Sequence, residues 1–415
     1  MFWLVYFLNH ADRQIVFSVF PLLKTELSLT NTQLGLLGSS FQWVYACLVP
    51  VAGFLGDFVS RKRIIVSALL LWSLTTVSSG LVTGFALLLA LRALTGAGEA
   101  FYYPSATSII ADYHGEKTRA LAMSIHQTSL YFGVVVSGTF AGYLGQQFGW
   151  RSAFLVFGVA GLAAAAMLLR FLHEPRRGEA DTSGAHAGAR DGQPQSADVP
   201  LPSLGARLKT LCRTPSVLAL AGSFCGMSFA SVAVVTWMPA YIFGLGGFSL
   251  AEAGFHATFY HQLGAFIGVL AGGWVADRFA VRSSLSRPWV QAAGLLLSVP
   301  FLYWIGSATS TVALFLALGV FGVFRGIYDS NLFASLFEVV PPETRATATG
   351  LMLSLGFLVG GTSPVVVGNL SQNWGLGPSL GATSIFYLAA GVLMLANIAF
   401  WFRTDSSRMK AALAR

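Results

Sequence analysis

The chain has 415 residues, of which 55% are hydrophobic and only 10% are charged, and its net charge is +8. A soluble domain carries roughly a quarter of charged residues, so this composition excludes a disordered chain, a coiled coil and an ordinary cytosolic enzyme. Three cysteines are too few for a disulfide framework or a four-ligand zinc site. The length and apolar content indicate a protein that crosses a bilayer many times.

Twelve apolar stretches are long enough to span a membrane. A spanning helix needs about 20 mostly apolar residues, because the hydrocarbon core is about 30 Å thick. The runs also lack the period-two alternation of membrane strands, so we predict an all-α membrane protein. The predicted spans are 2–23, 34–56, 64–83, 85–112, 118–143, 152–172, 216–243, 254–276, 288–307, 311–339, 346–370 and 380–402.

Basic residues are distributed unequally between the two ends of these spans. Loops alternate between two sides, and one side carries twenty Lys and Arg whereas the other carries only Lys24 and Arg151. The positive-inside rule therefore predicts that the basic side and both termini are cytoplasmic, in a plasma (inner) membrane. Topology accounts for the charge, so no nucleic-acid partner is expected. The chain shows no signal peptide, and its abrupt start suggests that a short cytoplasmic tail is absent.

A polar segment divides the spans into two sets of six. Residues 175–203 are rich in Gly, Ala, Pro, Ser and charge and cannot bury a core. We therefore predict a cytoplasmic linker at 173–213 between two six-helix bundles, residues 1–172 and 214–415. The halves repeat: GFLGDFVSRKR after the second span has a counterpart GWVADRFAVR 220 residues later, and EKTRA before the fifth has ETRA at an offset of 226. Such repeats are typical of secondary transporters.

The two repeated loops resemble the loop motif of the major facilitator superfamily. The resemblance implies the major facilitator fold. It also implies a cytoplasmic gate, in which Gly permits close helix packing and Asp pairs with basic residues at a helix end. The gating residues implied here are Gly53, Asp57, Arg61, Asp277 and Arg278.

Six charged residues fall well inside the predicted spans. A charge at mid-bilayer costs about 2.5–3.5 kcal/mol on insertion scales, so these residues should share an aqueous cavity. Arg92 and Glu99 are seven residues apart and lie on one helix face. Arg325 and Asp329 are four apart and can pair directly. The six residues are Asp12, Arg13, Arg92, Glu99, Arg325 and Asp329.

Three segments of the first half resemble the anion:cation symporter family: LNHADR at 8–13, GAGEAFYYPSA at 96–106 and QFGWRSAF at 147–154. The resemblance implies that two carboxyls carry protons and that arginines bind or gate organic anions. The implied proton carriers are Asp12 and Glu99, and the implied anion-binding or substrate-contacting residues are Arg13, Arg92, Tyr45 and Gln127.

The repeat adds two substrate-binding candidates from the second half. At an offset of 226, Glu99 corresponds to Arg325 and Tyr102 corresponds to Tyr328. Guanidinium presents a rigid fork to a carboxylate, so we expect Arg13 and Arg325 to approach the substrate from the two halves. The intramembrane histidines His126 and His261 are expected to make hydrogen-bonded packing contacts rather than to relay protons.

The predicted function is proton-coupled symport of a small organic anion, such as a sugar acid or carboxylate, by alternating access. The segments GFLGD, HEPRRG at 173–178 and RPWVQAAGLLLSVPFLY at 287–303 instead resemble the spinster-like family, which leaves open a carrier of lysolipid or an amphipathic drug. A transporter-shaped sensor, with purely structural ion pairs, is a third alternative.

Motifs for other chemistry are missing from the sequence. It contains no nucleotide-binding loop, nucleophile elbow or metal-ligand spacing, so no enzyme activity, cofactor or metal is expected. Nothing in the sequence requires an oligomer, and we expect a monomer in the bilayer.

Overall fold

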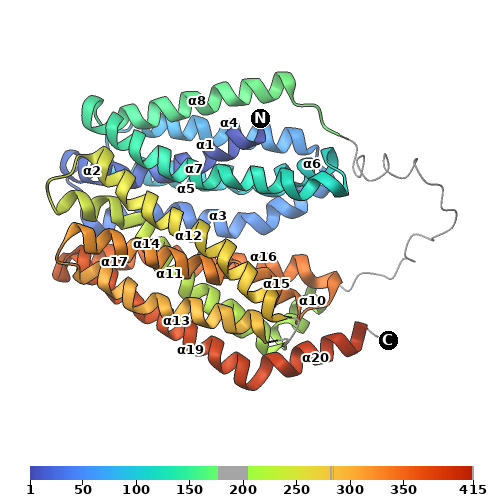
Figure 1. The fold of residues 1–415 in the computed structure, drawn as a ribbon. Helices are drawn as coiled ribbons and strands as arrows, with labels where there is room; N and C mark the ends of the chain where they lie inside the picture. The colour runs from blue at the N-terminus through green and yellow to red at the C-terminus, as the bar shows by residue number, and fades with distance from the viewer. Residues whose placement is uncertain (176–203, 281–282, 284, 414–415) are drawn as a thin grey trace.

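A computed structural model of the chain describes residues 1–175, 204–280, 283 and 285–413. Every element in these ranges is helical, which confirms the predicted all-α fold. The helices form two groups that lie side by side (Figure 1). Most of the predicted linker, residues 176–203, lies outside the described residues. The predicted linker also contains a short helix, α10 (Leu204–Cys212), which its polar composition did not indicate.

The first half is built from eight helices. They are α1 (Phe2–Ser18), α2 (Phe20–Glu26), α3 (Asn31–Phe58), α4 (Arg61–Ser79), α5 (Phe85–Ala100), α6 (Tyr102–Tyr113), α7 (Glu116–Phe148) and α8 (Trp150–Phe171).

The second half contains α11 to α20 and two short irregular helices. They are α11 (Pro215–Gly244), α12 (Leu250–Ala280), α13 (Ser286–Ser307), α14 (Thr311–Asp329), α15 (Leu332–Phe337), η1 (Pro342–Thr344), α16 (Arg345–Gly360), α17 (Ser363–Trp374), α18 (Leu376–Ala382), α19 (Ser384–Ala396), η2 (Asn397–Trp401) and α20 (Phe402–Leu413).

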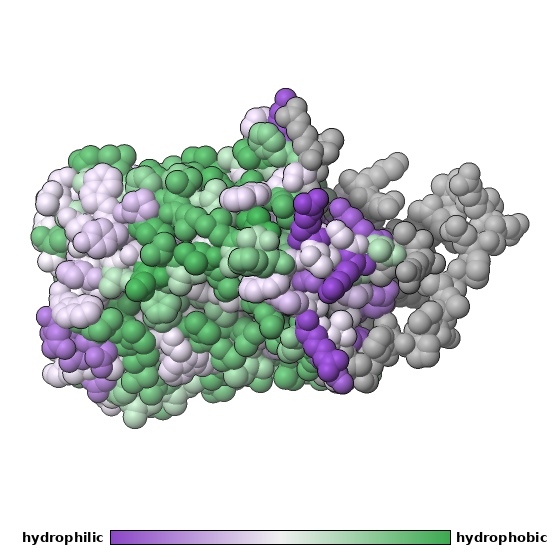
Figure 2. Space-filling view, turned by 90° about the horizontal axis from the view of Figure 1, so that it is seen from below, coloured by the Kyte–Doolittle hydropathy of each residue, from purple (hydrophilic) through white to green (hydrophobic). Residues whose placement is uncertain are grey.

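Within the described ranges these helices form twelve rods, six in each half, that follow the twelve predicted spans. Eight of the rods are long and apolar enough to cross a membrane by length and composition alone. The other four (α1 with α2, α4, α7 and α12) are shorter or carry more polar residues. In Figure 2 apolar residues cover the middle of the visible surface and polar residues gather at its two ends, as a bilayer requires.

Several rods are broken near their middle, as the Gly and Pro residues within the predicted spans allow. The fourth rod breaks at Phe101, between α5 and α6. Pro104 lacks the N–H that would bond the carbonyl of Ala100, so the helix cannot run through this point unchanged. The eleventh rod breaks between α16 and α17, where Pro364 has the same effect. The tenth breaks at Ser330 and Asn331. Broken helices bring backbone and side-chain polar groups to mid-membrane depth.

The internal repeat is visible in the backbone. Gly149 joins α7 to α8 with φ of 83°, and Gly375, 226 residues later, joins α17 to α18 with φ of 78°. Residues with side chains rarely adopt this left-handed conformation, which explains glycine at both positions. The two halves therefore fold by the same local rules.

The halves pack against each other at the end opposite α10 and the C-terminus (Figure 1). Three hydrogen bonds join them there: Asn31 Nδ2 to Ser371 Oγ at 2.8 Å, Gln372 Nε2 to Thr32 Oγ1 at 2.6 Å, and the Leu250 amide to Gln146 Oε1 at 2.8 Å. Among the residues that the structure describes, these are all the hydrogen bonds between the halves. The space between the halves is therefore closed at this end of the molecule.

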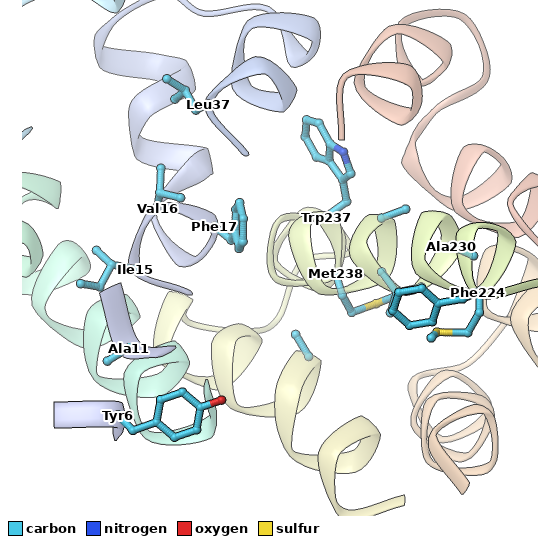
Figure 3. Packing of buried hydrophobic residues seen from close by; sticks show 14 of the residues in the cluster. Tyr6, Ala11, Ile15, Val16, Phe17, Leu37, Phe224, Ala230, Trp237 and Met238 are labelled. Carbon is cyan, nitrogen blue, oxygen red and sulfur yellow. The ribbon is translucent and has the colours of Figure 1, made fainter. Parts of the chain in front are cut away.

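Aromatic and glycine contacts complete this closed end. The ring centroids of Phe20 and Trp237 lie 5.3 Å apart across the boundary, and Figure 3 shows Phe17 and Trp237 extending toward it. A Cβ added at Gly142 would lie 2.3 Å from the carbonyl oxygen of Leu250, so only glycine permits this approach of α7 to α12.

The halves separate toward the opposite end. The face of α7 that carries Gly142 continues through Tyr131 to Gln127 and Ser124, both of which are exposed. On α12, the helix that faces α7, a Cβ added at Gly273 would meet no atom within 4 Å. The space between the halves is therefore open at the linker end.

Candidate functional site

Arg13 of α1 and Glu99 of α5 form a buried ion pair. Arg13 Nε lies 2.6 Å from Glu99 Oε2, and the side chain of Glu99 has no exposed surface whereas that of Arg13 is 20% exposed. Arg13 Nη2 also donates to Asn9 Oδ1 at 3.2 Å, one helical turn away. The sequence placed Arg92 and Glu99 on one face, but the direct partner of Glu99 is Arg13.

Aromatic rings of α3 line this ion pair. The Arg13 guanidinium carbon lies 4.4 Å from the ring centre of Tyr45 and 5.1 Å from that of Phe41. The Arg92 guanidinium carbon lies 4.9 Å from the same Phe41 ring. Each cation–π contact is worth about 2 kcal/mol when desolvated. The Phe41 ring therefore lies beside both guanidinium groups.

Asp12 and Arg92 are almost completely buried and poorly satisfied. Asp12 is 1% exposed, and neither of its carboxyl oxygens has a hydrogen-bond partner. Arg92 is 2% exposed and makes one long hydrogen bond, from Nη1 to the Asp12 carbonyl at 3.4 Å, while Nε and Nη2 have none. Buried polar groups left unsatisfied cost about 1–3 kcal/mol each, and more when charged. Such groups inside a membrane indicate function rather than stability.

The second half contributes a separate charged cluster. Arg325 Nε lies 3.4 Å from Asp329 Oδ2, which confirms that this pair can form within one helix. Arg325 Nη1 also lies 3.3 Å from His261 Nε2 on α12. Helices α12 and α14 are in close contact at Gly322. A Cβ added there would lie 2.4 Å from the His261 carbonyl oxygen, so only glycine permits this approach. Asp329 ends α14 at the break in the tenth rod, as Glu99 nearly ends α5.

Tyr131 of α7 approaches the second-half cluster from the first half and was not predicted from the sequence. Its ring centre is 6.0 Å from that of Phe266 on α12. It also lies close enough to Arg325 and Asp329 to interact electrostatically with both. Gln127, one turn earlier on the same face, is exposed toward the open end. Tyr131 could have been found in the sequence from its four-residue spacing to Gln127, which places both side chains on one face of the helix.

The model for the Major Facilitator Superfamily matches residues 2–364 and 247–415 of this chain. The chain belongs to the major facilitator superfamily. It is therefore a membrane transporter of that fold and not an enzyme.

Relatives of two kinds are similar to this transporter. It is 26% identical over 388 residues to the probable galactarate/D-glucarate transporter GudP of Bacillus subtilis (strain 168), covering 89% of this chain and 84% of the relative. It is 28% identical over 387 residues to protein spinster homolog 1 of Xenopus laevis, covering 88% and 70%. The fold is similar to a crystal structure of a bacterial homolog of the human lysosomal transporter spinster, described as inward-facing and unoccupied. For that structure the TM-score is 0.83 and the identity 22%, with 97% and 96% covered.

Two predicted substrate contacts occupy different environments in this transporter. Tyr45 is buried beside Arg13, and its ring centre lies 5.8 Å from Phe357 of the second half. Tyr328 is completely buried and its hydroxyl has no partner. Gly294 on α13 allows this close packing, since a Cβ there would lie 2.9 Å from the Tyr328 amide. Tyr45 is therefore near the charged site, whereas Tyr328 does not reach the opening in this conformation.

Arg61, one of the predicted gating residues, is the centre of a polar network in the first half. It is 2% exposed and pairs with Asp112 at the end of α6. Glu174 Oε1 accepts from the Arg61 amide at 2.8 Å and from its Nε at 3.3 Å. The Ser60 hydroxyl donates to Glu174 as well, at 2.5 Å. These contacts join α4, α6 and the segment after α8 into one unit.

The other gating residues make fewer contacts. Asp277 lies 3.3 Å from Arg287 rather than pairing with its neighbour Arg278, which is exposed. A Cβ on Gly53 would meet no atom within 4 Å, so this glycine makes no close helix contact in the present conformation. The side chain of Asp57 lies outside the described ones. The expected tight gate is thus absent from the described residues at this open end.

Proposed function

We propose that this transporter carries a small organic anion, such as a sugar acid or other carboxylate, together with protons by alternating access. The observation that carries the proposal is the buried Arg13–Glu99 ion pair beside the unpartnered carboxyl of Asp12. A site built for an apolar solute would not need such groups, since each charge is costly at this depth.

Anion binding follows from the arginines. Arg13 and Arg325 are 20% and 24% exposed, so both keep surface toward the space between the halves. Their planar forks suit a carboxylate held by two hydrogen bonds. Tyr45, Arg92, Gln127 and Tyr131 would surround the rest of the solute, and Tyr328 would reach it only after a rearrangement of α14.

Proton coupling follows from competition for Arg13. Ionised Glu99 holds Arg13 at 2.6 Å, and a proton on Glu99 would release the guanidinium to bind a substrate carboxylate. Proton and anion would then enter together and leave the site with no added net charge. Asp12, whose carboxyl makes no hydrogen bond of good geometry although Arg92 and Thr76 lie near it, would serve as the second proton carrier.

Alternating access would exchange the closed end for the open end. The described contacts close the end opposite the linker, so the positive-inside distribution would make this an inward-open state with cytoplasmic termini, in a plasma (inner) membrane. Residues 1–172 and 214–415 would move as two bodies joined by the linker at 173–213. A monomer contains every group that this cycle uses.

Uptake by the purified chain in proteoliposomes tests the proposal. A panel of labelled sugar acids, monocarboxylates and dicarboxylates is offered with and without an inward proton gradient, and a protonophore serves as the control. We expect accumulation of at least one acid that the protonophore abolishes. Binding of an acid without gradient-driven accumulation would contradict symport, and no movement of any solute would favour a sensor.

A second candidate function has one observation in its favour. An apolar cavity of about 260 Å³ lies between α3, α4 and α5, beside the break in the fourth rod. Its lining residues are Leu55, Ile64, Ser67, Ala68, Leu71, Gly98 and Phe101. Such a cavity would suit the tail of an amphipathic solute, as expected of a spinster-like carrier. Efflux of a fluorescent lysolipid that organic acids do not inhibit would favour this function instead.

A further inference from the structure

The two arginines proposed to meet the anion are held very differently. Glu99 approaches Arg13 to 2.6 Å with no exposed surface of its own. Asp329 stays 3.4 Å from Arg325 and is 26% exposed, and Arg325 Nε has no hydrogen bond of good geometry. A long, partly exposed ion pair contributes little and is easily replaced. Arg325 is therefore the more available of the two cations.

His261 gives Arg325 a second, neutral contact. The guanidinium has only donors, so His261 Nε2 accepts from Arg325 Nη1 across 3.3 Å. His261 is 1% exposed, and its ring stacks on Phe321 with centres 5.5 Å apart. The histidine cannot turn away without leaving this packed position.

Glycines fix the distance between the two helices that carry this contact. A Cβ on Gly326 would lie 2.2 Å from the Ala265 carbonyl oxygen, and one on Gly268 would lie 1.9 Å from that of Val323. Helices α12 and α14 thus touch backbone to backbone beside the His261–Arg325 contact. The imidazole is held at a set distance from the guanidinium.

We infer that His261 is a positioning residue for Arg325 and that Asp329 occupies the place of the substrate carboxylate in the empty carrier. This inference rests on the proposed function. An arriving carboxylate replaces Asp329 on Arg325, while His261 keeps the guanidinium aimed at the opening. The second half thereby provides the first anion contact, and the first half provides the proton carriers.

The surroundings of Arg325 are consistent with this assignment. The other ionisable groups near it are Tyr131 of α7 and Tyr387 of α19. The Tyr387 hydroxyl is engaged with Ser231 Oγ at 2.9 Å. Neither tyrosine offers an anion, so Asp329 is the carboxylate that a substrate has to displace.

Chemical labelling tests the assignment without any transported substrate. The full-length protein in detergent is treated with phenylglyoxal, and modification of Arg325 is followed by mass spectrometry. We expect Asp329→Asn and His261→Leu each to raise the labelling rate roughly three- to fivefold, because each removes one contact of the guanidinium. His261→Gln keeps an acceptor and should stay near the wild type. His256→Gln, on the same helix but packed on Phe315, is the matched control. Equal rates in all variants would overturn the inference.

Transport kinetics provide the second measurement. His261→Leu should raise the KM for the carried acid about tenfold with little change in Vmax, since a hydrogen bond to a charged group is lost. His261→Gln should restore most of the affinity, and Asp329→Asn should lower the KM. A KM that rises equally in the Leu and Gln variants, or rises in Asp329→Asn, would refute the roles. If the wild type carries no acid, the proposed function fails. The labelling rates of the variants then still show whether His261 and Asp329 hold the Arg325 guanidinium.

Discussion

Arg61 and Arg287 are 226 residues apart and make the same contact in the two halves. Each pairs with an acidic residue 51 positions later, Asp112 and Glu338. A second pair of arginines repeats this relation: Arg119 Nε donates to the Ala111 carbonyl at 3.2 Å, and Arg345 Nη2 to the Phe337 carbonyl at 3.5 Å. Each half therefore ties its third, fourth and fifth rods together at the linker end.

The Arg61–Asp112 and Arg287–Glu338 ion pairs should contribute differently to stability, because the two arginines are buried to different extents. Arg61 is 2% exposed, whereas the side chain of Arg287 is 29% exposed. We expect Arg61→Gln to lower the free energy of unfolding by about 3 kcal/mol, since it removes a buried cation that pairs with both Asp112 and Glu174. Arg287→Gln should cost about 1 kcal/mol. Thermal unfolding of the two variants in one detergent measures the difference, and equal losses would contradict it.

Glu99→Gln should separate proton coupling from binding. The amide can still contact Arg13 but cannot take up or release a proton, so gradient-driven accumulation should be abolished while exchange of internal for external substrate continues. Uptake and exchange assays on the same proteoliposomes measure both. Full pH-driven accumulation in Glu99→Gln would remove this residue from the coupling mechanism.

Gly142→Val should prevent the closed end from forming. The new side chain would meet the backbone of Leu250 at about the 2.3 Å given for its Cβ, and backbone cannot move aside as a side chain does. Overpacking of this kind costs about 1–3 kcal/mol, which is enough to shift the balance between two conformations roughly tenfold or more.

The shift can be read from distances between spin labels across the closed end. Gly244→Val is the control, since a Cβ at Gly244 meets nothing within 4 Å. Distances that widen equally in both variants would show that the collision is not the cause.

Glu174 should make stability depend on pH below the neutral range. Burial alone would raise its pKa, but hydrogen bonds from Ser60 and Arg61 outweigh burial and hold the pKa below its ordinary value of 4.5. A depressed carboxyl pKa contributes stability above the unfolded pKa, and that contribution is lost as the pH falls through the folded pKa.

Glu174→Gln should therefore lower the unfolding temperature at pH 7, with a loss of about 1 kcal/mol, typical of a capping carboxylate. The difference between Glu174→Gln and the wild type should shrink as the pH falls below about 4.5. Thermal scans between pH 3.5 and 7 measure it. A difference that does not change over this range would contradict the role of the ionised carboxylate.

Much of the fold could be predicted because membrane helices follow length and hydropathy. The apolar runs predicted the twelve rods, and the polar segment and repeated loops predicted their division into halves; the Gly149 and Gly375 backbones show the same 226-residue repeat. The positions of the breaks beside Glu99 and Asp329 could not be predicted. Pro104 follows the first, but a proline near mid-span ends some membrane helices and only bends others, and no proline lies at the second. The helix α10 was missed because its polar sequence resembles the linker before it.

The site was predicted as a set of residues but not as a set of contacts. The cost of charge in a membrane identified Asp12, Arg13, Glu99 and Arg325 without any coordinates. It could not decide that Glu99 pairs with Arg13 rather than Arg92, because that depends on how α1 and α5 are rotated against each other. Tyr131 was missed for a related reason, whereas His261 makes the hydrogen-bonded packing contacts that were predicted for it. Each reaches its contacts across a helix interface that glycines or aromatic rings define.

The contact between the two halves at the closed end has a consequence for how the transporter changes conformation. Its three described hydrogen bonds are all between uncharged groups, and its closest contacts are between backbones. Each such bond contributes about 1 kcal/mol, because water offers an almost equivalent partner when the halves separate. Separating the halves at this end therefore breaks none of the described ion pairs. The energy barrier to opening should then depend on how readily water enters the contact, and only weakly on ionic strength.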